Sequence, residues 1–150
     1  MIKNIFHFFC FVFLIFTLKT EARNRSEFSS LLVSSVDFCS HEDLPESSCY
    51  ERLDDYFYQI YDMSNVELSA KIDDASIMAV CSLLGHENYM VRYRAARILG
   101  AMGKAATIAL PRLRAAEADS KPKFGGGALF QGQEAEKAIG LAIERIEGER

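Results

Sequence analysis

The strongest constraint on the fold is a stretch in the second half of the chain, residues 91–103, which reads VRYRAARILGAMG. Its apolar residues recur at helical spacing and form one stripe: Val91, Ala95, Ile98, Leu99 and Met102. The small alanines of this stripe allow another helix to approach closely. Gly100 predicts a close crossing inside the helix, and Gly103 predicts its C-terminal end. Such a helix is typical of stacked helical repeats, so we predict an all-α fold.

The same stripe recurs at two other places in the chain. Forty-four residues later, it falls on Ala135, Ile139, Ala142, Ile143 and Ile146. Thirty-eight residues earlier, it falls on Leu53, Phe57, Ile60 and Tyr61. We predict helices from about residue 47, and at about 74–84, 89–103, 105–118 and 133–147, with no strand alternation in any window. Pro111 is expected to kink the helix at 105–118, and residues 120–130 form a glycine-rich insertion.

Several pieces of residues 74–119 together form a known pattern. They are Leu83-Leu84, Val91-Arg92, Ala95-Ala96, Leu99-Gly100, Met102-Gly103, Ala106, Ala109-Leu110-Pro111, Leu113 and Asp119. This segment resembles a HEAT-like repeat of the short bacterial type, which is also found in phycobilisome-lyase-like proteins. The resemblance is weaker over 133–148. His86 and Glu136 stand where the family usually has Asp and Arg, so a regular ladder of ion pairs is not expected, although Asp119 remains a candidate partner for Arg92.

The resemblance implies a fold and a class of function. The expected fold is a short α-solenoid of antiparallel helical hairpins, with about two HEAT-like repeats and a degenerate N-terminal helix. The family pattern implies that such a protein binds other proteins, usually without catalysis.

The first 22 residues have the pattern of a secretory signal peptide. Lys3 gives a positive start, residues 5–18 are almost wholly apolar, and Thr20-Glu21-Ala22 supplies small residues at a cleavage site. The apolar run has 14 residues, fewer than the roughly 20 needed to span a bilayer as a helix. We therefore predict an exported protein, periplasmic or secreted. If residues 1–22 are retained, the protein is instead a membrane-anchored adaptor, and only then is membrane contact expected.

The remainder of the chain divides into two parts. We predict a polar, partly disordered segment at 23–46 and a repeat domain at 47–150. Within the polar segment, the spacing of four apolar residues fits one short helical face: Phe28, Leu31, Leu32 and Val36.

Three cysteines follow the signal segment: Cys39, Cys49 and Cys81. In an oxidising compartment, a bridge from Cys39 to Cys49 that closes a short polar loop is the simplest pairing. Cys81 lies on an apolar helical stripe, where a free cysteine behaves as a small hydrophobic residue. Pairing of either other cysteine with Cys81 stays open, because connectivity cannot be read from sequence. The spacing of Cys39, His41 and Cys49 is a poor match to a zinc site, so no metal or cofactor is predicted.

Charge is unevenly distributed along the chain. Residues 23–88 carry 4 basic and 13 acidic side chains, whereas residues 89–150 carry 11 basic and 7 acidic ones. The candidate partner-binding residues are basic side chains of the second half and two aromatic residues of the insertion: Arg92, Arg94, Arg97, Arg112, Arg114, Lys121, Lys123, Phe124 and Phe130. Clustered on one face, the cations could meet an acidic protein, anionic lipid or a polyanion. The alternatives are an ordinary solvated face and, for the two aromatic residues, capping of the core.

We predict an exported, non-catalytic scaffold for protein binding or assembly. The sequence shows no Ser/His/Asp or Cys/His arrangement, and its glycine-rich loop lacks the lysine of a phosphate loop. Aromatic residues are sparse among the cations, which disfavours nucleic acid as a partner. The partner is therefore expected to be a protein. The alternative function is a lyase-like or chaperone-like subunit that acts on a protein or chromophore client.

Overall fold

The computed structural model describes residues 27–40, 46–119 and 129–148, and these ranges contain helices and no strand. A first helix covers residues 27–39. It is followed by α2 (Glu46–Asp62), α3 (Asn65–Lys71), α4 (Asp74–Ser82), η1 (Leu83–Gly85), α5 (Tyr89–Met102), η2 (Gly103–Ala109), α6 (Leu110–Asp119) and α7 (Leu129–Glu147), where η1 and η2 are 3₁₀-helices. The prediction of an all-α fold is confirmed.

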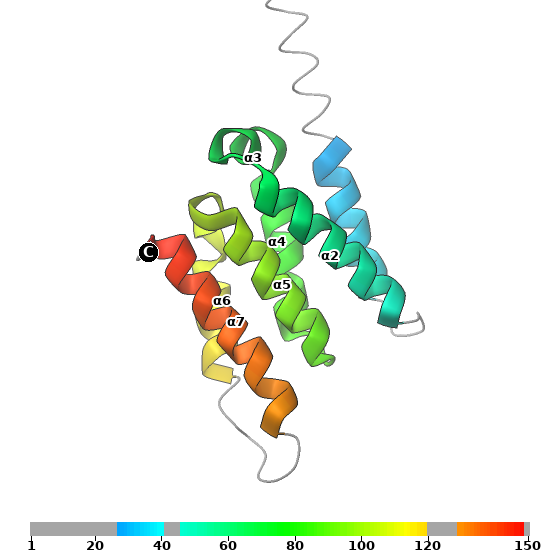
Figure 1. Cartoon of the computed structure of the whole chain (residues 1–150), viewed down its shortest axis with the longest axis vertical. Helices are drawn as coiled ribbons and strands as arrows, with labels where there is room; N and C mark the ends of the chain where they lie inside the picture. Colours follow the sequence, from blue (N-terminus) through cyan, green and yellow to red (C-terminus); the bar gives the residue numbers. More distant parts are fainter. Residues whose placement is uncertain (1–26, 41–45, 120–128, 149–150) are drawn as a thin grey trace, which may run out of the picture.

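The helices lie in two layers (Figure 1). In the front layer, α5 lies between α2 and α7 and contacts both of them. In the second layer, α4 lies behind α5, and α6 lies behind α7. Helix 27–39 contacts α2, where the centres of the Phe28 and Tyr56 rings lie 5.6 Å apart. The described residues thus include three successive helical pairs: helix 27–39 with α2, α4 with α5, and α6 with α7.

The core lies between the layers and contains the predicted stripes. All five stripe residues of α5 are buried, and Leu99 is fully inaccessible to solvent. The later stripe on α7 is buried too, except that Ile143 is only partly covered. On α2, the burial predicted for the earlier stripe is confirmed for Leu53, Phe57 and Ile60. It is wrong for Tyr61, which is 62% exposed. The ring of Tyr61 lies beside the ring of Phe57, with the two centroids 5.7 Å apart.

The helix over residues 27–39 lies in the segment predicted to be polar and partly disordered, and it contains the short helical face expected within that segment. Leu32 and Val36 are buried in the core, whereas Leu31 is exposed. Ser29 is also buried, and its hydroxyl donates to the Lys71 carbonyl at 3.0 Å. A serine tolerates burial when its hydroxyl has a backbone acceptor, so a serine-rich composition does not exclude a packed helix.

The short helix α3 falls outside the helices predicted from apolar spacing. It begins with a capping box, in which the Ser64 hydroxyl accepts from the Glu67 N–H and the Glu67 carboxylate accepts from the Ser64 N–H at 3.0 Å. These bonds from Ser64 hold the pKa of Glu67 below its usual value. The motif is visible in the sequence, but with only seven residues α3 is too short for a stripe to stand out.

The predicted helix at 105–118 is divided, so the prediction of one kinked helix is wrong. The chain forms η2 and then α6, and Pro111 lies in the first turn of α6, where its missing N–H removes no bond within the helix. The Leu110 N–H bonds the Thr107 carbonyl, which is the acceptor that a continuous α-helix would assign to residue 111. Ala106 leaves the helical conformation with φ −92° and ψ 23°.

The two glycines of the opening stretch have the predicted roles. Gly103 ends α5 with a φ of 53°, a conformation that side chains with a Cβ rarely adopt. Gly100 lies where α5 and α7 approach closely, because a Cβ built there would be 3.1 Å from the Ala142 Cα and 3.3 Å from its Cβ.

We expect Gly100→Val to lower the free energy of unfolding by about 1–3 kcal/mol, because the added methyl groups would force the backbones of α5 and α7 apart. The matched control is Gly140→Val on α7, where a Cβ would meet only the flexible tip of Glu117 at 3.7 Å. Urea denaturation followed by circular dichroism measures both variants. Equal stability of the two variants would contradict the close approach of α5 and α7.

Among the described residues, no helix is both long and apolar enough to cross a membrane. Residues 1–22 lie outside the described ranges, so the signal peptide and the anchor both stay predictions.

Candidate binding surfaces

The structure places Cys39 and Cys49 at disulfide distance, with sulfurs 2.21 Å and Cα atoms 5.2 Å apart. This pair joins the end of helix 27–39 to the first turn of α2. The Arg52 guanidinium lies 4.2 Å from the centre of the Phe38 ring and adds a second contact between the same helices. Cys81 is a free, buried cysteine. His41, which together with Cys39 and Cys49 is a poor match to a zinc site, lies outside the described residues.

A thiol-labelling experiment tests this pairing. Burial raises the pKa of the Cys81 thiol to about 11, although the nearby Arg112 cation acts in the opposite direction. The thiol is therefore protonated at pH 8, and we expect iodoacetamide to modify no cysteine downstream of residue 22 in the folded, unreduced protein. Denaturation without reductant should expose one reactive thiol, and denaturation with reductant should expose three. Mass spectrometry counts the adducts, and more than one adduct before reduction would contradict the Cys39–Cys49 bridge.

The five predicted arginines do not share one face. Arg94 and Arg97 extend toward α2, Arg92 and Arg112 line a pocket between α4 and α6, and Arg114 forms an ion pair with Glu147 on α7. Positions two apart on a helix are rotated by about 200°, so neighbouring arginines are separated on the surface. Lys121, Lys123 and Phe124 lie outside the described residues. Phe130 lies in the first turn of α7, and the structure does not describe its side chain.

Arg94 joins α5 to α2 and is largely covered, so it belongs neither to a free binding face nor to an ordinary solvated one. Its Nε and Nη2 donate to one carboxylate oxygen of Asp54 at 3.1 and 2.9 Å. Its guanidinium also lies 4.4 Å from the centre of the Tyr50 ring, and only 12% of the side chain is exposed. Arg97 approaches the other oxygen of Asp54 at 3.7 Å and lies 3.7 Å from the centre of the Phe57 ring.

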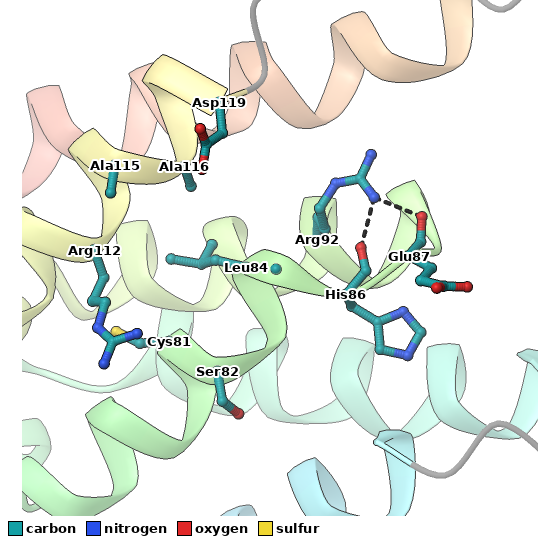
Figure 2. Close-up of a pocket in the computed structure, with 11 residues that line it drawn as sticks. Cys81, Ser82, Leu84, His86, Glu87, Arg92, Arg112, Ala115, Ala116 and Asp119 are labelled. Carbon is teal, nitrogen blue, oxygen red and sulfur yellow. Dashed lines mark hydrogen bonds between the residues drawn. The ribbon is translucent and has the colours of Figure 1, made fainter. Parts of the chain in front are cut away.

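Arg92 and Arg112 line a pocket of about 490 Å³ at the junction of α4, η1, α5 and α6, which we call the arginine pocket (Figure 2). Arg92 Nη1 donates to the carbonyl oxygens of His86 and Glu87, both at 2.6 Å. Partial burial lowers the pKa of Arg92 from its usual value. Asp119 lines the same pocket, but in the described part of the chain no ion pair joins it to Arg92, since the turn at 86–87 already holds the guanidinium.

The chemistry of the arginine pocket is mixed. It is lined by the cations Arg92 and Arg112, by the carboxylates of Glu87 and Asp119, and by apolar side chains that include Leu84 and two alanines. The Cys81 sulfur lies beside Arg112 (Figure 2), but the raised pKa keeps it a thiol at neutral pH. The pocket therefore offers hydrogen-bond donors and acceptors rather than an activated nucleophile.

A larger hollow of about 720 Å³ lies on the front layer, where α5 is flanked by α2 and α7; we call it the front groove. Its floor consists of small residues of α5 and α7: Ala96, Gly100, Ala138 and Ala142. Rings from α2 and α5 line one side: Phe57, Tyr61 and Tyr93. Of the predicted partner-binding residues whose side chains the structure describes, only Arg97 lines the groove.

The opposite wall of the front groove comes from α7 and is missing from the predicted site. Glu134, Lys137, Leu141 and Arg145 line it at spacings of three, four and four residues, so they form a second stripe on α7 beside the buried one. This stripe is present in the sequence, but periodicity alone does not show that it borders a groove, because that depends on where α5 and α2 lie.

Across residues 27–40, 46–119 and 129–148, no group of three or more His, Cys, Asp or Glu side chains is placed to hold a metal ion. The chain matches no model of a protein family, and no curated protein or solved structure shows significant similarity to it.

Proposed function

We propose that this chain is an exported, non-catalytic scaffold that binds a polypeptide segment of another protein in the front groove. The observation that carries the proposal is the groove itself, which combines exposed aromatic and aliphatic side chains with cations on three packed helices. Tyr61 is 62% exposed and Leu141 is 41% exposed, although both are large and apolar enough to be buried. Aromatic residues and arginine are the types that dominate binding energy in protein interfaces.

The helical arrangement supports a short α-solenoid of the HEAT-like kind. The three successive pairs would be three stacked hairpins, which is one helix more than the two repeats and the degenerate N-terminal helix expected from the sequence. In such arrays, one helix of each hairpin contributes to a continuous binding surface. The helices α2, α5 and α7 would supply this surface, and the front groove lies along it (Figure 1).

The alternative function, a lyase-like or chaperone-like subunit, is favoured only by the arginine pocket. A lyase that holds its client covalently through Cys81 would need a thiolate, and the pKa of about 11 disfavours one. The scaffold is therefore the better proposal.

The Cys39–Cys49 pair supports export, because disulfides persist in oxidising compartments. Mass spectrometry of the exported protein should find Arg23 at its N-terminus. Intact Met1 in the membrane fraction would instead favour the anchored adaptor.

Site-specific photocrosslinking in the source cells tests the scaffold function. A benzoylphenylalanine replaces Leu141 in the groove or, as a matched control, Ile108, which is 43% exposed and does not line the groove. We expect adducts with one or a few polypeptides from position 141 and none of these from position 108. The purified partner should then bind the recombinant chain directly. No adduct at 141, or the same adducts at both positions, would contradict the proposal.

A further inference from the structure

We infer that the segment held in the front groove is acidic, with an aromatic or aliphatic side chain between two carboxylates. This inference rests on the proposed function of the groove and adds the chemistry of its occupant.

The charges that line the groove favour an acidic occupant. Among the described residues, three cations line it, Arg97, Lys137 and Arg145, against one carboxylate, Glu134. Lys137 and Arg145 are exposed, and within the described part of the chain neither forms an ion pair. Arg97 is already held near Asp54 and against the Phe57 ring, so its guanidinium is less available to pair with a partner. The two cations of α7 are therefore the side chains available to pair with a partner.

The positions of these cations set the spacing of the partner's acidic residues. Lys137 and Arg145 are eight residues apart on α7, which corresponds to about 12 Å along the helix axis. In an extended segment, two residues four apart lie about 13 Å from each other and on the same side of the chain. Leu141 lies midway between the two cations, so the residue midway between the acids lies opposite it. The pattern expected in the partner is acid, apolar, acid at every second residue.

The groove provides a place for that middle side chain. Leu141 and Tyr61 offer apolar surface on opposite walls, and the small residues Ala96, Gly100, Ala138 and Ala142 form the described floor between them. Such a floor leaves room for a ring or a branched aliphatic side chain. An acidic peptide without an apolar residue would leave this surface uncovered and is expected to bind weakly.

A nucleic acid is a poorer match than an acidic peptide. The carboxylate of Glu134 lines the groove and that of Asp54 lies behind Arg97, where both would repel a continuous row of phosphates. The whole chain also has a net charge of −4, which opposes attraction of a long polyanion.

The test measures binding of short fluorescein-labelled peptides to the purified protein by fluorescence polarisation, at low and at physiological salt. One peptide carries two acids four residues apart with a phenylalanine midway. A second peptide has lysines in place of the acids, and a third has glycine in place of the phenylalanine. A single-stranded oligonucleotide serves as a competitor.

We expect the first peptide to bind at least about tenfold more tightly than the other two, with weaker binding as salt increases. The double variant Lys137→Glu/Arg145→Glu should bind the acidic peptide more than about tenfold more weakly than the parent does. The same variant should bind the lysine peptide more tightly than the parent does. The control variant Arg52→Glu/Lys104→Glu removes the same charge from exposed residues that line neither the groove nor the arginine pocket, and it should change affinity by less than about threefold. Glu134→Gln should strengthen binding of the acidic peptide.

The lysine peptide binding as well as the acidic one, or an unchanged preference in the Lys137→Glu/Arg145→Glu variant, would overturn the inference. Displacement by the oligonucleotide with the same dependence on these two cations would also overturn it, because the groove would then be a polyanion site. If photocrosslinking at position 141 captures a polypeptide but the acidic peptide does not bind, the scaffold function stands and only the acidic assignment fails. If neither experiment gives a signal, both proposals fail.

Discussion

Leu99→Asp is expected to leave the protein largely unfolded. Leu99 is fully buried at the centre of the α5 stripe, and α5 is the helix that contacts both α2 and α7. An aspartate there loses the apolar contacts of the leucine and buries a carboxyl group that has no cation beside it. The combined cost of about 4 kcal/mol or more is comparable to the whole stability of a small domain.

The matched control for Leu99→Asp is Leu141→Asp, which places the same new charge at a leucine exposed in the front groove. This variant should remain helical and melt cooperatively, with a change in stability below about 1 kcal/mol. Circular dichroism and thermal melts compare the two proteins. A Leu99→Asp variant that melts like the parent would show that α5 does not pack with this face toward the core.

Arg94→Glu is expected to destabilise the fold by about 2–4 kcal/mol, because it places a carboxylate against Asp54 in a largely covered position. It also removes the cation from the face of the Tyr50 ring. The exposed Arg112 provides the control: it has no hydrogen bond or ion pair within the described residues, so Arg112→Glu should change stability by less than about 0.5 kcal/mol.

A charge swap separates pairing from other effects of the Arg94 substitution. In the double variant Arg94→Glu/Asp54→Arg, the two charges are exchanged, so about half or more of the lost stability should return. Urea denaturation of the parent, both single variants and the double variant gives the coupling energy. Additive losses in the double variant would show that Arg94 and Asp54 do not act as a pair.

The sequence was sufficient to predict the helices that carry long apolar stripes. The stripe from Val91 to Met102 and its later copy on α7 report burial directly, because helical spacing brings these side chains to one side of each helix. The roles of Gly100 and Gly103 could also be predicted, because a close helix crossing and a helix end with positive φ each favour glycine. The helix over 27–39 was only partly foreseen, because its buried serines resemble those of a loop until the acceptor for Ser29 is known.

The binding surfaces could not be predicted in the same way. Arg94 lies off the apolar stripe, and its burial depends on Asp54 and Tyr50, which lie about forty residues earlier in the chain. Likewise, the wall of the front groove on α7 becomes a wall only because α5 and α2 lie beside it. Periodicity identifies which face of one helix is apolar, but a groove is a property of three helices together.

The link between Cys39 and Cys49 has a consequence for how the fold opens locally. If helix 27–39 detaches, the link keeps its end beside the first turn of α2. Reattachment is then an intramolecular event at an effective concentration in the millimolar range, instead of a search by a free segment. Detachment of helix 27–39 is therefore brief and reversible. During such local opening, α2 can keep its position at the edge of the front groove.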